Sequence, residues 1–576
     1  MAAIYSLSAE RPLAHAAGDV RWQALPDWAS VLLAPHGLPL DEWLRDGAAQ
    51  VVKRGGHRTV YRVELPQRTF YVKHYRSPGK VSALRHLFRP STARREWTKA
   101  VEIGRRGVPT VTPVALGEQC RNGLVRDSFL VTAAIPGAVT LDEYVANVLS
   151  QLGRRRQMRC RTELIIAVAQ LCATAHRAGV DHNDFHAGNI LVQHGSDDAQ
   201  RRDRAKALSL YLIDVPGVRL RGPLNWRQSR ASLIALHAAW RGQLTSRERR
   251  SFVRVYLAAR ADLRISPSAA EAEIVERTWE YAWRIMRGRD RRAALTNRDF
   301  YRLVTAHGVA HSVRDFTAAE LAAVLADPES LIRRNLHRPT KLSHSSVVVE
   351  AQLNLGGVPA PVAFKRCRRK TWSKRLAALF GPSRAWRSWC FGHALRARGI
   401  ATPRPILVCQ PRGVCQRDSY LATEWIVGAT DLHLYGWDLA RRSPVERHRR
   451  ARQLAEALGR LIGRLHAWNI SHRDLKALNL LVVEQADRVE CSLIDLDAIR
   501  FCRRLTSVAR ANDLARLAVS LAAHPWAPRT ARMRFLRAYI AELPDAGIDQ
   551  REFARQIAAR EARIARRQSR KGKPNV

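Results

Sequence analysis

The sequence predicts an α+β protein made of two tandem two-lobed domains, each with a β-rich N-lobe followed by a helical C-lobe. Three observations predict this architecture. The chain of 576 residues is too long for one ordinary hydrophobic core. Four segments of the first half recur, in the same order, in the second half. Within each half, strand patterns come first and helix patterns later.

The internal repeat determines the number of domains. Residues 94–118 match 384–410, and "RDSFLVTAAIPGA" at 126–138 matches "RDSYLATEWIVGA" at 417–429. Two later matches keep the order: 175–192 with 465–482, and 210–220 with 491–501. A repeated unit of this length is too long for a solenoid repeat, so we expect each copy to be a complete domain.

The elements of the first copy follow from local patterns. Alternation of apolar and polar residues over 57–76 predicts a hairpin of two strands. A helix is expected next, ending at Gly107, then the strand "SFLVTAA" and a second helix at 163–179 that stops at its glycine. Two short strands, "ILV" and "LYLID", lead to further helices. Residues 270–335 are predicted to be helical and basic and to lead into the second copy.

These patterns give the expected domain bounds. The first domain is predicted at 1–295 and the second at 296–565, with a basic, disordered tail at 566–576. The lobes are expected at about 45–133 and 137–295 in the first domain, and at about 335–424 and 428–565 in the second.

The composition limits the class of protein. A net charge of +46 indicates an anionic partner, either nucleic acid, an acidic membrane face or a phosphorylated glycolipid, or else a generally basic solvated surface. No zinc-finger, RNP-type or helix-turn-helix signature supports nucleic acid. The sequence has no apolar run long enough for a membrane-spanning helix and no secretory signal pattern at its start. Nine scattered cysteines indicate a reduced, cytoplasmic chain.

Each half carries an Asp followed five residues later by an Asn, directly before an apolar strand. "HNDFHAGNILV" contains Asp184 and Asn189, and "HRDLKALNLLV" contains Asp474 and Asn479. In a short loop, such an Asp can accept a proton from an incoming hydroxyl, and the Asn carbonyl can hold a divalent cation. The pattern therefore predicts phosphoryl-transfer chemistry.

The same chemistry needs a second cation ligand and a cation for the phosphates. Asp214 in "LIDV" and Asp495 in "LIDL" end the next predicted strand in each half. Lys73 in "FYVKHY" and Lys365 in "VAFKRC" lie on an upstream strand. In the first copy, Glu96 on the following helix is expected to hold the lysine in place.

Together these motifs resemble the protein-kinase-like superfamily. The stretches "HNDFHAGNILV", "AHRAG" and "LIDVPGVRL" are most similar to the lipopolysaccharide kinase family of the Kdo/WaaP type, and the resemblance covers each half once. It implies a two-lobed kinase-like fold, with residues 133–135 and 424–426 as the hinges that receive adenine. It implies the following roles: catalytic bases Asp184 and Asp474; magnesium ligands Asn189, Asp214, Asn479 and Asp495; and nucleotide-phosphate contacts Lys73 and Lys365, with Glu96, and with Gly55 and Gly56 as a phosphate-covering turn.

The resemblance implies an ATP- and Mg2+-dependent phosphotransferase that acts on a sugar hydroxyl of lipopolysaccharide core or a related glycolipid. The alternatives are a kinase for proteins or aminoglycoside-like molecules, and a pseudokinase pair that serves as a scaffold. The charge favours peripheral contact with an acidic, cytoplasmic membrane face. The sequence does not determine the oligomeric state.

The two copies depart from the family pattern in different ways. The second copy has Ser388 at the position of Glu96, and its phosphate loop "KLSHSSVVVEAQL" lacks glycine. The first copy has Ser232 where the second has Asp513, the place of a supporting Asp in kinase-like proteins. We expect the first copy to be the more active. We further expect His176 and His466 to be buried at helix ends. Asp497 is either a further metal ligand or, as we expect, a plain loop carboxylate.

Overall fold

The computed structural model divides the chain into two compact units, Met1–Ala282 and Trp283–Val576. It describes residues 12–17, 19–76, 90–121, 124–194, 208–240, 244–336, 339–343, 346–368, 382–411, 418–524, 527–544 and 546–570. The long helix α9 (Pro267–Arg292) crosses from one unit into the other. The boundary between the two domains that the sequence patterns gave stays a prediction.

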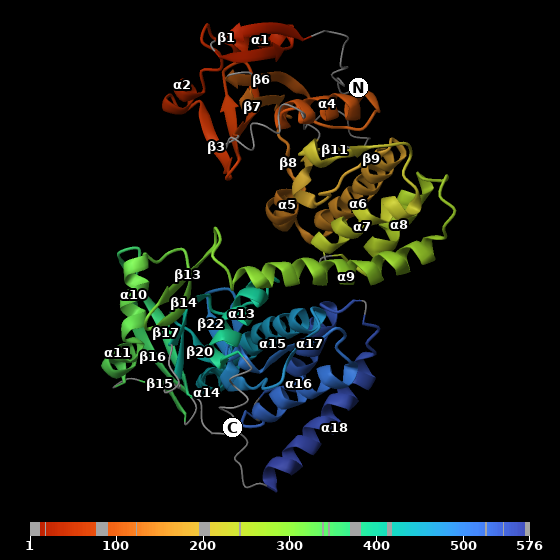
Figure 1. The fold of residues 1–576 in the computed structure, drawn as a ribbon. Coiled ribbons are helices and arrows are strands. Elements are labelled where there is room, and N and C mark those ends of the chain that lie inside the picture. Colours follow the sequence, from red (N-terminus) through yellow and green to blue (C-terminus); the bar gives the residue numbers. More distant parts are fainter. Residues whose placement is uncertain are drawn as a thin grey trace. The chain divides into compact units, whose positions relative to one another are not determined.

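The N-lobe of the first unit is built on a seven-stranded antiparallel sheet with the order β1-β2-β6-β7-β5-β4-β3. Figure 1 labels β1, β6, β7 and β3 of this sheet. Its core contains Trp22, Tyr61 and Phe70, and helices α1 and α2 contribute to it. The strands are β1 (Leu13–Ala17), β2 (Val20–Ala24), β3 (Ala49–Arg54), β4 (Arg58–Glu64), β5 (Thr69–Arg76), β6 (Pro113–Arg121) and β7 (Leu124–Ala133), and the helices are α1 (Pro26–Leu32), α2 (Leu40–Arg45) and α4 (Thr92–Arg105).

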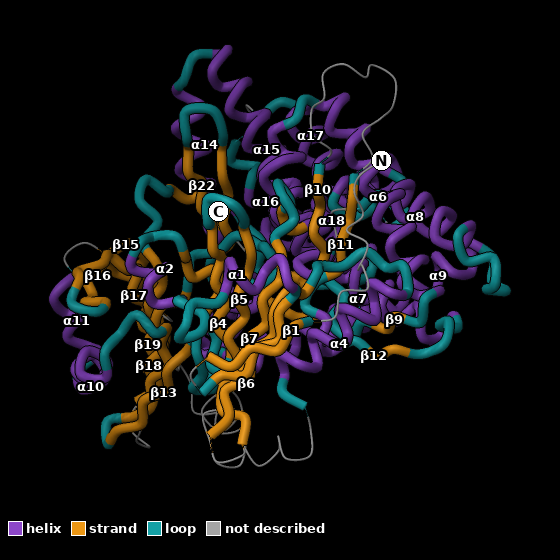
Figure 2. The backbone as a smooth tube through the Cα atoms, turned by 90° about the horizontal axis from the view of Figure 1, so that it is seen from above, coloured by secondary structure: helices purple, strands orange, loops and turns teal. Residues whose placement is uncertain are grey.

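The alternation that predicted the β4–β5 hairpin also assigns its two faces. Tyr61 and Phe70 point into the core, whereas the pairs Arg58 with Tyr75 and Val60 with Lys73 lie on the other face. Figure 2 shows β4, β5 and β7 side by side. The predicted hairpin and the predicted stop of α4 at Gly107, which has a φ of 74°, are confirmed.

The C-lobe of the first unit is mostly helical, with two small sheets of order β11-β10-β8 and β12-β9. Helix α6 runs through its centre and carries the buried face that the sequence predicted. The elements are β8 (Val139–Thr140), α5 (Leu141–Glu143), α6 (Arg154–Arg177), β9 (Val180–Asp181), β10 (Ile190–Gln193), β11 (Ser209–Leu212), β12 (Arg219–Leu220), α7 (Trp226–Ala239) and α8 (Ser246–Ala258).

The second unit repeats this topology. Its large sheet has the order β13-β14-β18-β19-β17-β16-β15, and its small sheets have the orders β20-β22-β23 and β21-β24. The strands are β13 (Phe300–Thr305), β14 (Gly308–Val313), β15 (Pro339–Ser343), β16 (Ser346–Leu355), β17 (Val358–Arg368), β18 (Pro405–Pro411), β19 (Asp418–Glu424), β20 (Thr430–Asp431), β21 (Ile470–His472), β22 (Leu480–Glu484), β23 (Val489–Leu493) and β24 (Ile499–Phe501). The helices are α10 (Ala318–Ala326), α11 (Pro328–Asn335), α13 (Arg384–Arg396), α14 (Leu432–Arg441), α15 (Pro444–Ala467), α16 (Ser507–Ser520), α17 (Arg529–Ala541) and α18 (Gln550–Ser569). The predicted fold class, α+β with two tandem two-lobed units, is confirmed.

Three local predictions are wrong. The segment 270–335 is not helical throughout, because β13 and β14 form a hairpin inside it and pair with β18. The first sheet also begins well before residue 45, since β1 and β2 extend it. The β1–β2 hairpin is short and rich in Ala, and β13 has apolar residues in adjacent pairs, so neither hairpin has the apolar alternation of β4 and β5. Finally, α18 continues through 566–569 of the predicted tail, while 571–576 lie outside the described residues.

Within the described ranges, no helix has the length and apolar character that crossing a bilayer requires.

Candidate active site in each unit

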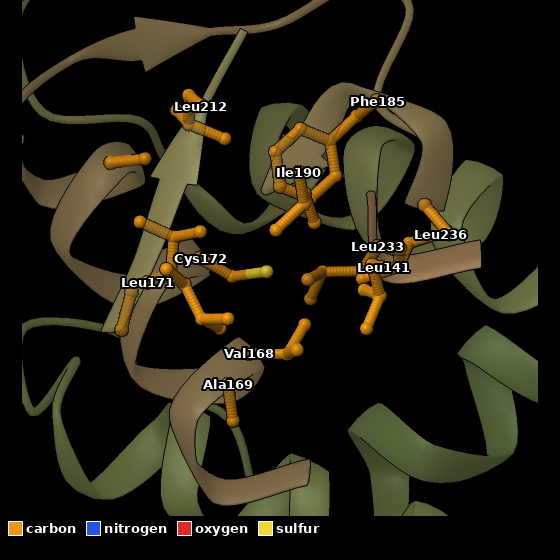
Figure 3. Packing of buried hydrophobic residues seen from close by; sticks show 14 of the residues in the cluster. Leu141, Val168, Ala169, Leu171, Cys172, Phe185, Ile190, Leu212, Leu233 and Leu236 are labelled. Carbon is orange, nitrogen blue, oxygen red and sulfur yellow. The ribbon is translucent and has the colours of Figure 1, made fainter. Parts of the chain in front are cut away.

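The loop that carries Asp184 is anchored by the hydrophobic core beneath it. Phe185, the next residue, is 1% exposed and belongs to the same cluster as Ile190, Leu212 and Val168 of α6 (Figure 3). The Asp184 side chain itself is 78% exposed. Burial of the neighbouring ring therefore fixes the loop, while the carboxylate stays open to a substrate.

The Asn of each motif holds its Asp in place through the backbone. Asn189 Nδ2 donates a hydrogen bond to the Asp184 carbonyl oxygen at 2.9 Å. Asn479 Nδ2 donates to the carbonyl oxygen of Asp474 at 2.8 Å and to its Oδ2 at 3.1 Å. In both units the amide nitrogen is therefore used within the loop, and the Oδ1 atom is the one left for a cation.

A buried histidine connects each loop to the end of the next strand. His182 Nε2 lies 3.2 Å from the carbonyl oxygen of Ile213, and His472 Nε2 lies 3.4 Å from that of Ile494. Burial lowers the pKa of both imidazoles, so they donate these bonds as neutral rings. No role was predicted for these two histidines, although both stand inside the motifs that carry Asp184 and Asp474.

The backbone brings the second predicted ligand beside the first. Ile213 N donates to the Asn189 carbonyl oxygen at 3.0 Å, so Asn189 and Asp214 lie on neighbouring strand ends. Asp214 and Asp495 have left-handed φ values of 57° and 59°. This conformation is uncommon for residues other than glycine and clusters at functional sites.

The first unit brings the predicted lysine and glutamate together. Lys73 on β5 forms an ion pair with Glu96 on α4, which is 2% exposed and also accepts a hydrogen bond from the Tyr75 hydroxyl. Arg58 on β4 holds Asp214 with two bonds, from Nη1 to Oδ1 at 2.7 Å and from Nη2 to Oδ2 at 3.2 Å. Burial alone would raise the pKa of Asp214, but the bonds from Arg58 and the charge of Lys73 lower it.

The second unit pairs its lysine differently. Lys365 Nζ lies 2.6 Å from Asp495 Oδ1, and Ser388, at the position of Glu96, is buried. Burial would lower the pKa of Lys365, but the Asp495 carboxylate raises it. Asp497, which was expected to be a plain loop carboxylate, forms an ion pair with Arg384 at the start of α13.

Asp513 supports the loop of the second unit, as its place in the sequence indicated. It is 1% exposed and accepts hydrogen bonds from Ser471 Oγ at 2.7 Å and from the His472 backbone nitrogen at 3.0 Å. In the first unit the two residue types are exchanged, since Asp181 replaces the strand serine and Ser232 replaces the helix aspartate.

The two helix-end histidines are buried, as predicted. His176 is 1% exposed and bonds the Tyr256 hydroxyl at 3.0 Å, while His466 is 0% exposed and bonds that of Tyr539 at 2.7 Å. Both act as packing residues of the helical lobe.

Gly55 and Gly56 form the turn between β3 and β4. Gly55 N donates to the Arg58 carbonyl oxygen at 2.8 Å, and a Cβ on Gly55 would lie 3.3 Å from that oxygen. A Cβ on Gly56 would meet nothing within 4 Å, so this turn leaves its backbone uncovered. The corresponding turn of the second unit includes 344–345, outside the described residues.

The predicted hinges follow β7 and β19. Ala134 N donates to the Thr69 carbonyl oxygen at 3.1 Å, and Trp425 N donates to that of Pro361 at 3.3 Å. The first hinge is therefore hydrogen-bonded to the start of β5, which carries Lys73. The second is hydrogen-bonded to a residue within β17, which carries Lys365.

The Asn and Asp side-chain oxygens of each unit fit magnesium. The Oδ1 atom of Asn479 is buried and has no hydrogen-bond partner within the described ranges, so it is an orphaned oxygen of the type that a cation satisfies. Among the described residues no cluster of three or more His, Cys, Asp or Glu side chains could hold a metal ion. One Asn and one Asp per unit match Mg2+, which commonly binds few protein oxygens together with substrate phosphates.

Comparison with known proteins agrees with this geometry. The model of the lipopolysaccharide kinase (Kdo/WaaP) family matches residues 42–256 and again 361–539. The chain is 30% identical to the lipopolysaccharide core heptose(I) kinase WaaP of Pseudomonas aeruginosa over 209 residues, which are 35% of this chain and 74% of that protein. It is 26% identical to the WaaP of Escherichia coli over 207 residues, or 35% and 75% of the two chains.

Two further matches are weaker, one in the share of the relative that is covered and one in structural similarity. The 3-deoxy-D-manno-octulosonic acid kinase of Xylella fastidiosa is 32% identical over 146 residues, which are 23% of this chain and 53% of that protein. A solved structure of WaaP in complex with acyl carrier protein has 23% identity and a TM-score of 0.33, and it covers 46% of this chain and 98% of its own.

The family match occurs once in each unit and includes both Asp–Asn loops, and the repeated sheet order agrees with the predicted duplication. The chain is therefore a tandemly duplicated kinase of the lipopolysaccharide kinase (Kdo/WaaP) family, whose members phosphorylate sugars of lipopolysaccharide.

Proposed function

We propose that the protein transfers the γ-phosphoryl group of ATP to a sugar hydroxyl of lipopolysaccharide core or a related glycolipid, with the first unit as the more active site. The observation that carries the proposal is the Lys73–Glu96 ion pair, in the same unit as Asp184, Asn189 and Asp214. A kinase needs this lysine held by a carboxylate other than its metal ligand, so that both the phosphates and the metal find their partners.

The residues of the first unit support each part of the reaction. Asp184 accepts the proton of the sugar hydroxyl, whose oxygen attacks the γ-phosphorus. The bond from that phosphorus to the β–γ bridging oxygen breaks, and ADP leaves. Lys73 contacts the phosphates, and the backbone of Gly55–Gly56 covers them. The exposed position of the Asp184 carboxylate allows a large sugar to approach.

Asn189 and Asp214 would hold Mg2+. When bound, the ion neutralises charge that develops on the phosphate oxygens. The chain's own part is to present oxygen ligands from adjacent strand ends, through the backbone bond between Ile213 and Asn189.

The preference for the first unit rests on how the lysines are paired. In the second unit, Lys365 is 2.6 Å from Asp495, so nucleotide and metal together must separate this pair before either residue can act. The buried Ser388 offers Lys365 no carboxylate in exchange. We therefore assign Asp474, Asn479 and Asp495 to a weaker kinase site or to a binding domain.

The charge supports the proposed acceptor and location. A net charge of +46 attracts an anionic glycolipid and the acidic face of a membrane without any spanning helix. We therefore propose a cytoplasmic protein that works peripherally at the cytoplasmic membrane face.

The test is transfer of label from γ-labelled ATP to extracted lipopolysaccharide core glycolipid in the presence of Mg2+. Asp184→Asn should lower the rate at least about 100-fold, and Asp474→Asn only a few-fold, since an alcohol acceptor needs its base. No transfer by the unaltered protein, or full transfer by the double variant, would contradict the proposal. Parallel reactions with a protein and an aminoglycoside acceptor separate the alternative kinase functions.

A further inference from the structure

Arg58 forms a two-bond contact with the carboxylate that the proposed function assigns to the metal. Its Nη1 and Nη2 atoms lie 2.7 and 3.2 Å from the two oxygens of Asp214, and the side chains are 23% and 25% exposed. A guanidinium bound to both oxygens and a divalent cation compete for this carboxylate, because their positive charges repel at such short range. We therefore expect metal binding to weaken the contact.

Arg58 also stands where nucleotide phosphates would lie. It is the third residue after Gly55, whose amide bonds the Arg58 carbonyl oxygen and closes the glycine turn. It shares one face of the sheet with Lys73, because Arg58 pairs with Tyr75 and Val60 pairs with Lys73. A guanidinium that leaves Asp214 thus remains next to the lysine and the uncovered turn, and it can bind phosphate oxygens through two donors.

The second unit lacks this arrangement as a set. The register of β16 and β17 places Ser346 opposite Cys367 and Val348 opposite Lys365, as Arg58 and Val60 stand opposite Tyr75 and Lys73. The positions of Arg58, Tyr75 and Glu96 are therefore occupied by Ser346, Cys367 and Ser388, and Lys365 itself takes the aspartate. All three residues are absent together from the second unit, as expected if they act as one group in the first.

We propose that Arg58 is a positioning residue of the first unit that exchanges partners, from Asp214 to the phosphates of the nucleotide, when Mg2+ and ATP bind. This inference rests on the proposed function. In this exchange, the two-bond contact holds the strained Asp214 in its left-handed conformation, and the released guanidinium adds a second cation to the phosphate site beside Lys73.

The exchange can be tested by binding, without turnover. The full chain is titrated with a fluorescent, non-hydrolysable ATP analogue at a series of Mg2+ concentrations, and with adenosine. Arg58→Met should weaken binding of the analogue about 10-fold, since a phosphate contact is lost, and should lower the Mg2+ concentration for half-saturation several-fold, since a competitor for Asp214 is gone. Adenosine, which has no phosphates, should bind as before.

Arg62→Met is the matched control, because it removes the same charge from the same face of β4 but from a residue paired with Glu64. Arg62→Met should change neither the affinity for the analogue nor the Mg2+ concentration for half-saturation. Arg58→Lys should recover part of the analogue affinity, which separates a charge effect from a folding defect. If Arg58→Met left both the affinity and the Mg2+ dependence unchanged, or if Arg62→Met changed them equally, the inference would be wrong. If the unaltered protein bound no analogue, that result would contradict the proposed function itself, and with it this inference.

Discussion

The Nζ atom of Lys365 lies 2.6 Å from Oδ1 of Asp495, so the second unit pairs its strand lysine with the carboxylate at the end of β23. In the first unit the corresponding Lys73 is paired with Glu96 on α4 instead. Two units with the same strand order and the same Asp–Asn loop thus differ in their ion pairs. The first unit pairs its strand lysine with a helix glutamate, and the second pairs it with the aspartate that ends β23.

The Lys73–Glu96 pair gives the first prediction. Glu96→Gln should lower kcat/KM for label transfer about 10- to 100-fold, because an amide of equal size no longer holds the ammonium group. Steady-state kinetics with the glycolipid acceptor measure the change. Ser388→Ala, at the equivalent buried position of the second unit, is the control and should have little effect. A larger loss from Ser388→Ala than from Glu96→Gln would reverse our assignment of the active unit.

Asp513 gives a stability prediction. Asp513→Ala should destabilise the second unit by about 2–4 kcal/mol, since Ser471 Oγ and the His472 nitrogen lose a buried acceptor. Thermal unfolding followed by circular dichroism tests it, with the two units expected to give separate transitions. Arg516→Ala removes a 40%-exposed partner of the same carboxylate and should cost less than about 1 kcal/mol. Equal losses from both variants would argue against Asp513 as a support of the loop.

Buried histidines predict a fall in stability in acid. Burial lowers the pKa of His176 to about 3, and the charge of Arg260 adds to this, whereas an unfolded histidine titrates near 6.5. The unfolded chain therefore binds the extra proton between these values. The stabilisation is fully present above about pH 6.5 and is lost as the pH falls toward 3, at up to about 1.4 kcal/mol per pH unit for this residue.

The measurement is the urea midpoint of the first unit between about pH 7 and pH 4. His176→Gln should lower stability at neutral pH and flatten the pH dependence, because the titrating ring is gone. Substitution of the exposed His36 by Gln is the control and should leave the slope as it is. An unchanged slope for His176→Gln would show that His176 is not a buried neutral group.

Two helical glycines give opposite predictions for the same substitution. A Cβ on Gly459 of α15 would lie 2.5 Å from the Phe535 carbonyl oxygen and 2.8 Å from Cβ of Ala538, both on α17. A Cβ on Gly288 of α9 would meet nothing within 4 Å. Gly459→Ala should therefore destabilise by about 1–3 kcal/mol and Gly288→Ala should stabilise by about 0.5–1 kcal/mol. Thermal unfolding compares them, and a stabilising Gly459→Ala would contradict the close approach of α15 and α17.

The sequence alone determined the duplication, the fold class and the loops with Asp184 and Asp474. These features can be read from residues that are close together in the sequence. A repeat is recognised by matching segments, and an Asp–Asn loop before an apolar strand has the same spacing in both copies. The strands β1, β2, β13 and β14 were not predicted. They form short edge hairpins, of which the first is rich in Ala and the second has adjacent apolar pairs, so both lack the alternation that marks a half-buried strand.

Only the tertiary structure decided which charges meet. Arg58 and Asp214 are 156 residues apart in sequence, and Lys365 and Asp495 are 130 apart. The sequence predicted that Glu96 holds Lys73, but it did not show that Lys365, which has Ser388 at that position, pairs with Asp495, or that Arg58 pairs with Asp214. That choice of partner depends on where the strands of one lobe and the loops of the other place their side chains, since an ion pair is decided over a few ångströms and a sequence motif is not.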